Sequence, residues 1–236
     1  MFFSSLYNLI ILFHFEFAKV NYKFYSAKFT RFFYESFLQN ASFKEINIVF
    51  LTPDEGPEIA KCTIMHPFKH FLTITRHRHL VMRNCFKCGL YWQGLTHDLS
   101  KYGFTEFWLG AKYYLGTKSP HHLERQEKGY SEAWMHHKGR NKHHAEYWVD
   151  INLKSLQYEP VDMPDKYIAE SICDRIAASK NYNWKNFEPH MALDYYHKEK
   201  TKLPLHPNTD RKFEFLLKLY AEKGEKALFE ELRKMK

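Results

Sequence analysis

Apolar residues recur at helical intervals through residues 66–88. The positions that share this spacing are Phe68, Phe71, Leu72, Ile74, Val81, Cys85 and Cys88. Intervals of three and four residues place apolar side chains on one face of a helix. We therefore predict a helix over 66–88 that Gly89 ends, because glycine accepts the left-handed backbone of a helix C-terminus.

Shorter helical patterns follow, punctuated by glycine and proline. The predicted elements are a return segment over 90–99, a helix over 107–115 capped by Thr105, an exposed helix or lid over 121–128 started by Pro120, a helix from Gly129 to Gly139, and another helix from His143. A straight helix would hold His77 and His97 about 30 Å apart, at roughly 1.5 Å per residue. The chain must therefore fold back between them if both bind one metal.

The C-terminal part is also helical in pattern. The predicted elements are a linker over 153–162, a helix after Pro164 with a buried stripe of Ile168, Ile172 and Ile176, an irregular region over 181–205, and two short helices, 210–222 and 225–234, separated by Gly224. The last two pack on the body through Phe213, Phe215, Leu216, Leu219, Leu228, Phe229 and Leu232. Residues 65–236 show no strand alternation and no internal repeat. The predicted fold class is all-α, a compact helical bundle.

Residues 1–64 differ from the rest of the chain. They are crowded with aromatic and aliphatic residues, but no hydrophobic period persists. The apolar run near the N-terminus is too short and too polar to span a bilayer, and no Lys or Arg precedes it as in a signal peptide. We predict two regions: a poorly patterned N-terminal extension over 1–64 and a helical domain over 65–236. The alternative is that translation starts at Met65 and that the extension is not part of the native protein.

The net charge of +8 lies entirely in residues 65–236, because the six Lys/Arg and six Asp/Glu of residues 1–64 cancel. A basic domain suits a phosphate-bearing ligand, and plain solubility explains the charge equally well. No helix carries a continuous basic stripe, which argues against nucleic-acid binding. The four cysteines are too sparse for a disulfide-stapled secreted fold and indicate a reducing cytoplasm. Cys85 and Cys88 continue an apolar helix face, which favours core filling.

Histidines and aspartates form the strongest chemical signal in the chain. In order they are His77, His97-Asp98, His137, His143-His144 and Asp174. Imidazole and carboxylate together suit Zn, Fe or Mn, and so many imidazoles in a short window are mutually costly unless a ligand or solvent reaches them. We predict a metal site here. His121 and His122 are expected to be solvated instead.

This order of ligands resembles that of the HD superfamily of metal-dependent phosphohydrolases. Residues 92–102, 131–148 and 173–180 also resemble a domain-of-unknown-function family of small bacterial and phage proteins, a likeness that covers nearly all of 65–236. The HD resemblance implies an HD-domain-like helical metal-binding domain with one or two divalent ions (Fe, Mn, Zn, Ni or Co). The implied ligands are His77, His97, Asp98, His137, His143, His144 and Asp174. Two intervals depart from the HD pattern. The interval from His77 to His97 is shorter than usual, which leaves His70 as an alternative to His77. His137 is only six residues before His143, which leaves open which of His136, His137, His143 and His144 bind directly.

The resemblance also implies an activity. A metal-activated water would hydrolyse a small phosphorylated substrate, a nucleotide or another phosphoester, with Asp98 and Lys101 as catalytic residues. Lys138 and Arg140 would bind the substrate, since Arg suits bidentate contact with phosphate oxygens. Two alternatives remain: a di-iron protein of oxidative or peroxide chemistry, and a non-catalytic metal- or nucleotide-binding protein. No membrane association is expected, and the sequence does not indicate an oligomeric state.

Overall fold

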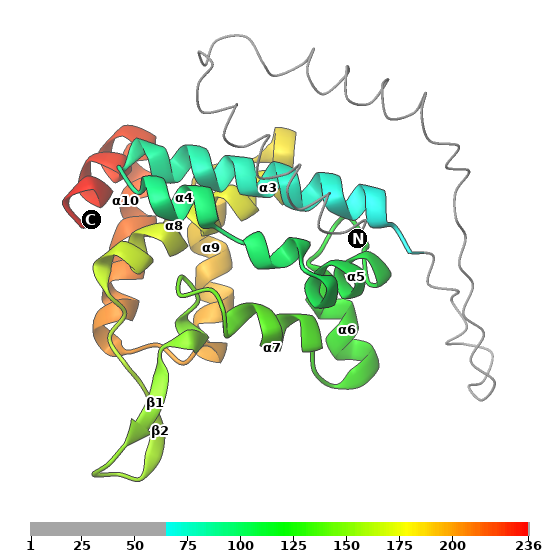
Figure 1. Ribbon diagram of the computed structural model, residues 1–236. Coiled ribbons are helices and arrows are strands. Elements are labelled where there is room, and N and C mark those ends of the chain that lie inside the picture. The colour runs from blue at the N-terminus through cyan, green and yellow to red at the C-terminus, as the bar shows by residue number, and fades with distance from the viewer. Residues whose placement is uncertain (1–64, 236) are drawn as a thin grey trace. The chain divides into compact units, whose positions relative to one another are not determined.

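The computed structural model describes residues 65–235, which form a mostly helical structure (Figure 1). The helices are α3 (Pro67–Lys87), α4 (Tyr91–Thr96), α5 (Phe104–Lys112), α6 (Pro120–Lys128), α7 (Glu132–Lys138), α8 (Asp165–Asn183), α9 (His190–Glu199) and α10 (Pro207–Leu232), with short 3-10 turns between them. The strands β1 (Val149–Asn152) and β2 (Gln157–Pro160) make one hairpin. The predicted helical class is confirmed. The predictions for residues 1–64, including the alternative start at Met65, concern a segment outside the described residues.

Helix α3 is the element against which much of this structure packs. It contacts α4, α5 and α8, and its apolar face enters the core through Ile74, Val81 and Cys85. The helix predicted over 66–88 is therefore confirmed, and Gly89 ends it with a φ of 81°. Cys85 and Cys88 are buried free thiols, which confirms that they fill the core.

The C-terminal helices complete the core on the other side of α8. The predicted stripe of Ile168, Ile172 and Ile176 is buried along α8. Helix α10 packs against α8 and α9, and Gly224 interrupts it with a φ of 75°, so the two predicted segments are present as one kinked element. Phe215 was predicted to pack on the body, but it is 55% exposed.

Four predicted elements differ from the structure. The irregular region over 181–205 contains α9, which packs on α10 through buried Ala192 and Tyr196. The hydroxyl of Tyr196 also donates to Asp210. Helix α5 begins at Phe104, ahead of the Thr105 cap predicted for it, because Gly103 already has the extended backbone of an N-cap. These short helices have weak apolar periods, so tertiary contacts set their limits.

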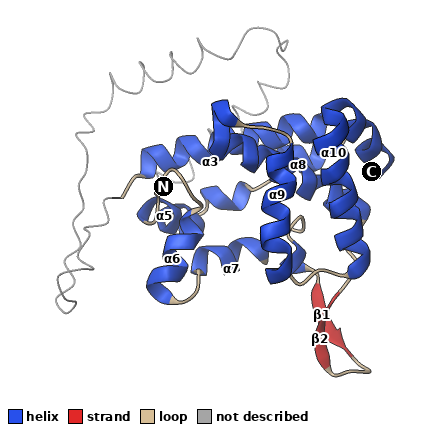
Figure 2. Cartoon of the chain, turned by 180° about the vertical axis from the view of Figure 1, so that it is seen from behind, coloured by secondary structure: helices blue, strands red, loops and turns tan. Residues whose placement is uncertain are grey.

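The third wrong element is the linker, part of which is the hairpin. Val149 pairs with Pro160 and Asn152 with Gln157 in antiparallel register, and in both views the hairpin extends beyond the helices (Figure 2). Neither strand has a buried residue, so no alternation of apolar and polar positions marked it in the sequence. The helix predicted from His143 is likewise a loop followed by a 3-10 turn.

No helix within residues 65–235 combines the length and the apolarity that crossing a bilayer requires.

Gly110 of α5 gives a test of this packing, because a Cβ at this position would overlap the ring of His70. We expect Gly110→Ala to lower the free energy of unfolding by about 1–3 kcal/mol, since overpacking exceeds the gain in helix propensity of about 1 kcal/mol. In a His70→Ala background the clash is absent, so the same change should stabilise. Urea denaturation of the four proteins measures this reversal, and an equal loss in both backgrounds would refute the contact.

Candidate metal centre

Two long helices bring the first pair of predicted ligands together. His77 lies in α3 and Asp174 lies in α8, and the two helices pack side by side. The Nε2 atom of His77 is 2.9 Å from Oδ1 of Asp174. Asp174 lies off the isoleucine stripe of α8, as the sequence pattern indicated, and this leaves its carboxylate available to α3.

The His97-Asp98 pair is held in place from α3. The guanidinium of Arg78, which is 3% exposed, donates to the carbonyl of His97 at 2.9 Å and to that of Leu95. These are carbonyls at the C-terminal end of α4, where no helical N–H follows to bond them. Asp98 then has a left-handed backbone with a φ of 53°, a conformation that Asp adopts more readily than most residues. The chain thereby turns sharply between the two side chains.

Two groups of predicted ligands share Asp98. In the first, the Nε2 atoms of His97 and His77 lie 3.4 and 3.9 Å from Oδ2 of Asp98. Asp174 Oδ1 lies 3.7 Å from His97 Nε2. The donor atoms of His77, His97 and Asp98 lie within 4.8 Å of one another, close enough for one ion to bind among them, and those of His97, His143 and Asp174 form a further set of this kind.

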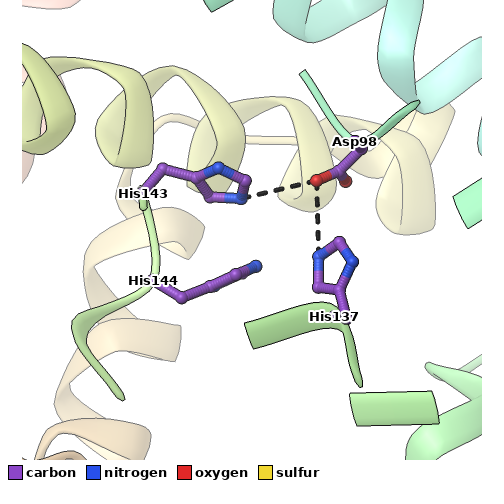
Figure 3. A group of neighbouring side chains, drawn as sticks. All are labelled: Asp98, His137, His143 and His144. Atoms are coloured by element: carbon purple, nitrogen blue, oxygen red, sulfur yellow. Dashed lines mark ion pairs between the residues drawn. The ribbon is translucent and has the colours of Figure 1, made fainter. Parts of the chain in front are cut away.

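The second group comes from α7 and the loop after it. The Nε2 atoms of His137 and His143 lie 3.3 and 3.5 Å from Oδ1 of Asp98, and His144 also points toward this space (Figure 3). One donor atom of each of these four residues lies within 4.8 Å of the others. Helix α7 ends at Gly139, and a loop that includes Asn141 follows. This allows α7 and the loop to supply imidazoles to one small volume.

Asp98 belongs to both groups, because its two carboxylate oxygens point to different sides. Oδ2 faces His77 and His97, whereas Oδ1 faces His137 and His143. The carboxylate is 2% exposed. A carboxylate placed in this way could bridge two ions, and the count of one or two ions stays a prediction.

Buried glutamates orient the imidazoles from behind. Glu170 of α8 accepts from Nδ1 of His97 at 2.9 Å and lies 3.2 Å from Nδ1 of His143. Glu106 of α5 accepts from Nδ1 of His137 at 2.7 Å. Burial raises the pKa of each glutamate, but the histidine partners outweigh it and hold the pKa low, so both stay ionised. When an ionised carboxylate accepts a hydrogen bond from Nδ1–H, the Nε2 lone pair of the neutral ring stays available.

The atoms that converge on this space fit a cation. Nε2 of His137, His143 and His144 and Oδ1 of Asp98 are buried and have no hydrogen-bond partner among the residues that the structure describes. Buried acceptors without donors carry a substantial desolvation cost. A divalent transition metal satisfies imidazole nitrogen and carboxylate oxygen together.

The carboxylates and His97 hold opposite charges. Burial opposes protonation of His97, but Asp98, Asp174 and Glu170 outweigh it and hold the pKa of His97 well above its usual value. Burial likewise opposes ionisation of Asp98, yet His97 and Lys101 hold the pKa of that carboxyl well below its usual value. His144 has few such partners, and burial holds its pKa well below the usual value. Metal-free protein therefore contains anionic carboxylates beside mostly neutral imidazoles.

The structure separates two histidines from the groups. His70 packs against Phe107 and Tyr114, and burial, followed by the charge of Lys101, lowers its pKa to about 4. His136 has its Nδ1 atom 2.6 Å from Oε1 of Glu106. His77 rather than His70 lies beside Asp174, and His137 rather than His136 lies beside Asp98.

The three basic residues predicted to act on the substrate occupy different places. Lys101 Nζ lies 2.7 Å from Oδ2 of Asp98, and its side chain is 25% exposed. Lys138, which is half-buried, ends α7. Arg140 is exposed and donates to the carbonyl of His136 at 3.2 Å. Among the side-chain contacts described for these three residues, only that of Lys101 reaches a predicted ligand.

Three residues that support the site, Glu106, Glu170 and Arg78, were not predicted from the sequence. Glu170 precedes Asp174 by four residues, so it shares a helix face with it and was detectable, whereas Glu106 meets its histidines only through tertiary packing. His121 was expected to be solvated, but this is wrong. Its ring is half-buried and stacks at 6.5 Å on His137, and burial holds its pKa well below the usual value.

The chain matches one known protein family. Residues 66–219 match the model of DUF5662, a family of unknown function. The chain belongs to this family. The matched region of this DUF5662 protein contains all the predicted ligands, and the predicted likeness to a family of unknown function is confirmed. The match gives no evidence of membership in the HD superfamily, so the HD resemblance stays a prediction. Searches of curated proteins and of solved structures found no match.

Replacing Glu170 tests whether it orients the donor atoms. We expect Glu170→Gln to weaken Mn²⁺ or Zn²⁺ binding by about 10- to 100-fold, because the amide is a weaker acceptor and no longer fixes the rings of His97 and His143. Glu132→Gln is the control, since this glutamate is 56% exposed and starts α7. Calorimetric titration of the full-length proteins measures both affinities. Equal affinity in the two variants would exclude the orienting role.

Metal binding should also depend on pH. The raised pKa of His97 means that its ring is protonated at pH 7 in metal-free protein, whereas a ligand imidazole must be neutral. Asp98 and Asp174 have lowered pKa values and are already ionised. Binding should therefore release about one proton, and affinity should rise about tenfold per pH unit until the pKa of His97 is passed. Calorimetry in buffers of different ionisation enthalpy counts this proton, and a pH-independent affinity would contradict the assignment.

Proposed function

We propose that this DUF5662 protein is a metal-dependent phosphohydrolase that acts on a small phosphoester. The observation that carries the proposal is the convergence of Nε2 atoms lacking hydrogen-bond donors around Asp98, whose two oxygens face two groups of histidines. This arrangement supports one or two divalent ions, taken from Fe, Mn, Zn, Ni and Co. When bound, such ions supply an activated water and stabilise negative charge on phosphoryl oxygens.

Lys101 is the residue of the chain that supports a phosphoryl reaction most directly. Burial opposes its charge, but Asp98 and Asp174 outweigh that effect and raise the pKa of the ammonium above its usual value. Lys101 therefore remains positively charged and is a poor proton donor. Its partly exposed ammonium lies at the ligands, where it neutralises the charge that grows on phosphoryl oxygens. Lys138 and Arg140 are proposed to bind the substrate farther out.

The proposed reaction is the hydrolysis of a phosphomonoester. The oxygen of water forms a bond to phosphorus, and the bond from phosphorus to the ester oxygen breaks. One water proton ends on the leaving alcohol, and the products are the alcohol and inorganic phosphate. Asp98 and Asp174, with lowered pKa values, remain anionic and hold their positions throughout.

Iron chemistry is the second candidate function. The second group offers three imidazoles and one carboxylate, which suits iron that reacts with oxygen or peroxide as well as a hydrolytic ion. A non-catalytic role in binding metal or nucleotide is the third. These candidates differ in what the purified protein contains and releases.

Elemental analysis and phosphate release from p-nitrophenyl phosphate test the proposal together. We expect the full-length protein to hold one or two transition-metal ions per chain, and His97→Ala or Asp98→Ala to lose metal and activity together. Lys101→Ala should keep its metal and lose about 10²-fold or more in kcat, as expected for removal of a charge that stabilises the transition state. His122→Ala, at an exposed position of α6, is the control and should change neither.

Two results would contradict the hydrolytic function. If the Asp98→Ala protein kept its full metal content and full activity, Asp98 would not be a metal ligand. A coloured, iron-loaded protein that consumes peroxide and releases no phosphate would support the iron alternative instead.

A further inference from the structure

Asn141 is the residue at which the segments of the second ligand group meet. It is half-buried and lies in the loop between His137 and the His143-His144 pair. Its side-chain amide and its backbone carbonyl form hydrogen bonds with the segments that carry Asp98, His137 and His144. The side chain of Asn carries no charge, so it acts on these segments through hydrogen bonds alone.

The amide nitrogen of Asn141 has two hydrogens, and both have acceptors. Nδ2 lies 2.8 Å from the carbonyl oxygen of His137 and 2.9 Å from Oγ of Ser100. Nδ1 of His137 is also 3.1 Å away, but that nitrogen donates to Glu106 and cannot accept at the same time. Asn141 therefore links the end of α7 to the turn that follows Asp98.

Ser100 extends this link to the carboxylate behind His137. Its hydroxyl accepts from Asn141 and donates to Oε2 of Glu106 at 3.1 Å. The same oxygen accepts from Nδ1 of His137 at 2.7 Å. The four residues thus form a closed ring of hydrogen bonds, and moving one member moves the imidazole that faces Oδ1 of Asp98.

The backbone of Asn141 holds the start of the loop that carries the other imidazoles. Its carbonyl accepts from the N–H of His144 at 3.2 Å. Trp148 fixes the same loop independently, because its Nε1 donates to the carbonyl of Lys142 at 2.7 Å. Loss of the Asn141 side chain should therefore shift the imidazoles of the loop relative to α7 without unfolding the loop.

Other contacts hold the first ligand group. His77 and Asp174 meet across α3 and α8, and Arg78 of α3 fixes the backbone ahead of Asp98. None of the side-chain contacts described for Asn141 reaches these residues. A change at Asn141 therefore acts on one side of Asp98 and leaves the other side in place.

We propose that Asn141 is a positioning residue that determines whether the second group holds an ion. This inference rests on the metal centre of the proposed function and deepens it, because it separates two ion sites by the contacts that hold each of them. With Asn141 in place, the second group holds its own ion and Asp98 bridges the pair. Without it, the first group keeps its ion alone.

Stepwise titration of Mn²⁺ into the full-length, metal-free protein tests this inference. We expect Asn141→Leu, which keeps the size of the side chain and removes its donors, to weaken the second binding step by about 10- to 100-fold, the usual effect of losing a residue that orients a ligand. The first step should be unchanged. Asn183→Leu is the matched control and should change neither step. The Asn183 amide also donates to the carbonyl four residues before it, but at an exposed position of α8.

Electron paramagnetic resonance distinguishes positioning from a general loss of stability. Two Mn²⁺ ions that share a carboxylate are magnetically coupled, so the fully loaded wild-type protein should lack the hyperfine pattern of an isolated ion. Asn141→Leu should show the isolated pattern, and Asn141→Gln, which keeps the donors, should restore part of the coupling. Ser100→Ala removes the same link from its other end, and it should also weaken the second step if Asn141→Leu does not fold.

The outcomes separate this inference from the proposed function. A weaker second step in Asn141→Leu, in a protein that releases no phosphate, would support the role of Asn141 and refute hydrolysis alone. Wild-type protein that binds no second Mn²⁺ ion would overturn the inference. An Asn141→Leu variant in which both steps are unchanged, or in which both weaken equally, would overturn it as well.

Discussion

A carboxylate removed from water must be compensated by positive charge or by strong donors, and Asp98 is 2% exposed. Lys101 lies 2.7 Å from Oδ2, which His77 and His97 also approach, and His137 and His143 approach Oδ1. Other parts of the structure hold this arrangement in place. Helix α3 supplies His77, and its Arg78 fixes the backbone that carries Asp98. Loss of this one carboxylate would leave the surrounding histidines without a shared partner.

The two glutamates make the arrangement specific. Glu170 and Glu106 accept hydrogen bonds from the Nδ1–H groups of the rings, and this decides which nitrogen each ring directs inward. Without them, the rings could form hydrogen bonds to one another and the inward lone pairs would be lost. The site is therefore built from three layers: helices that set distance, glutamates that set ring orientation, and histidines and aspartates that meet in the centre.

The sequence was sufficient for elements whose pattern is local and strong. The 66–88 helix, the isoleucine stripe of α8 and the break at Gly224 follow from spacing and from glycine, and the ligand order brought His77, Asp98 and Asp174 into one hypothesis. The hairpin was not predicted because neither strand has a buried residue, so apolar and polar positions do not alternate between a buried and an exposed face.

Contacts between distant segments were harder to predict. Glu106 meets His137 only because α5 packs on α7, and the half-buried position of His121 depends on the same packing. Such contacts cannot be predicted from the spacing of residues within one segment. Glu170 is the exception, since its position four residues before Asp174 already placed it on the right face.

The spread of the donor atoms along the chain has a thermodynamic consequence. His77 lies near the beginning of the described residues and Asp174 lies on the far side of the hairpin in sequence, so no short peptide from this chain contains the complete set. An ion that needs both residues binds the folded chain and not the unfolded one. Its binding free energy is therefore added to the free energy of unfolding, and the melting temperature of the protein becomes a function of the free metal concentration.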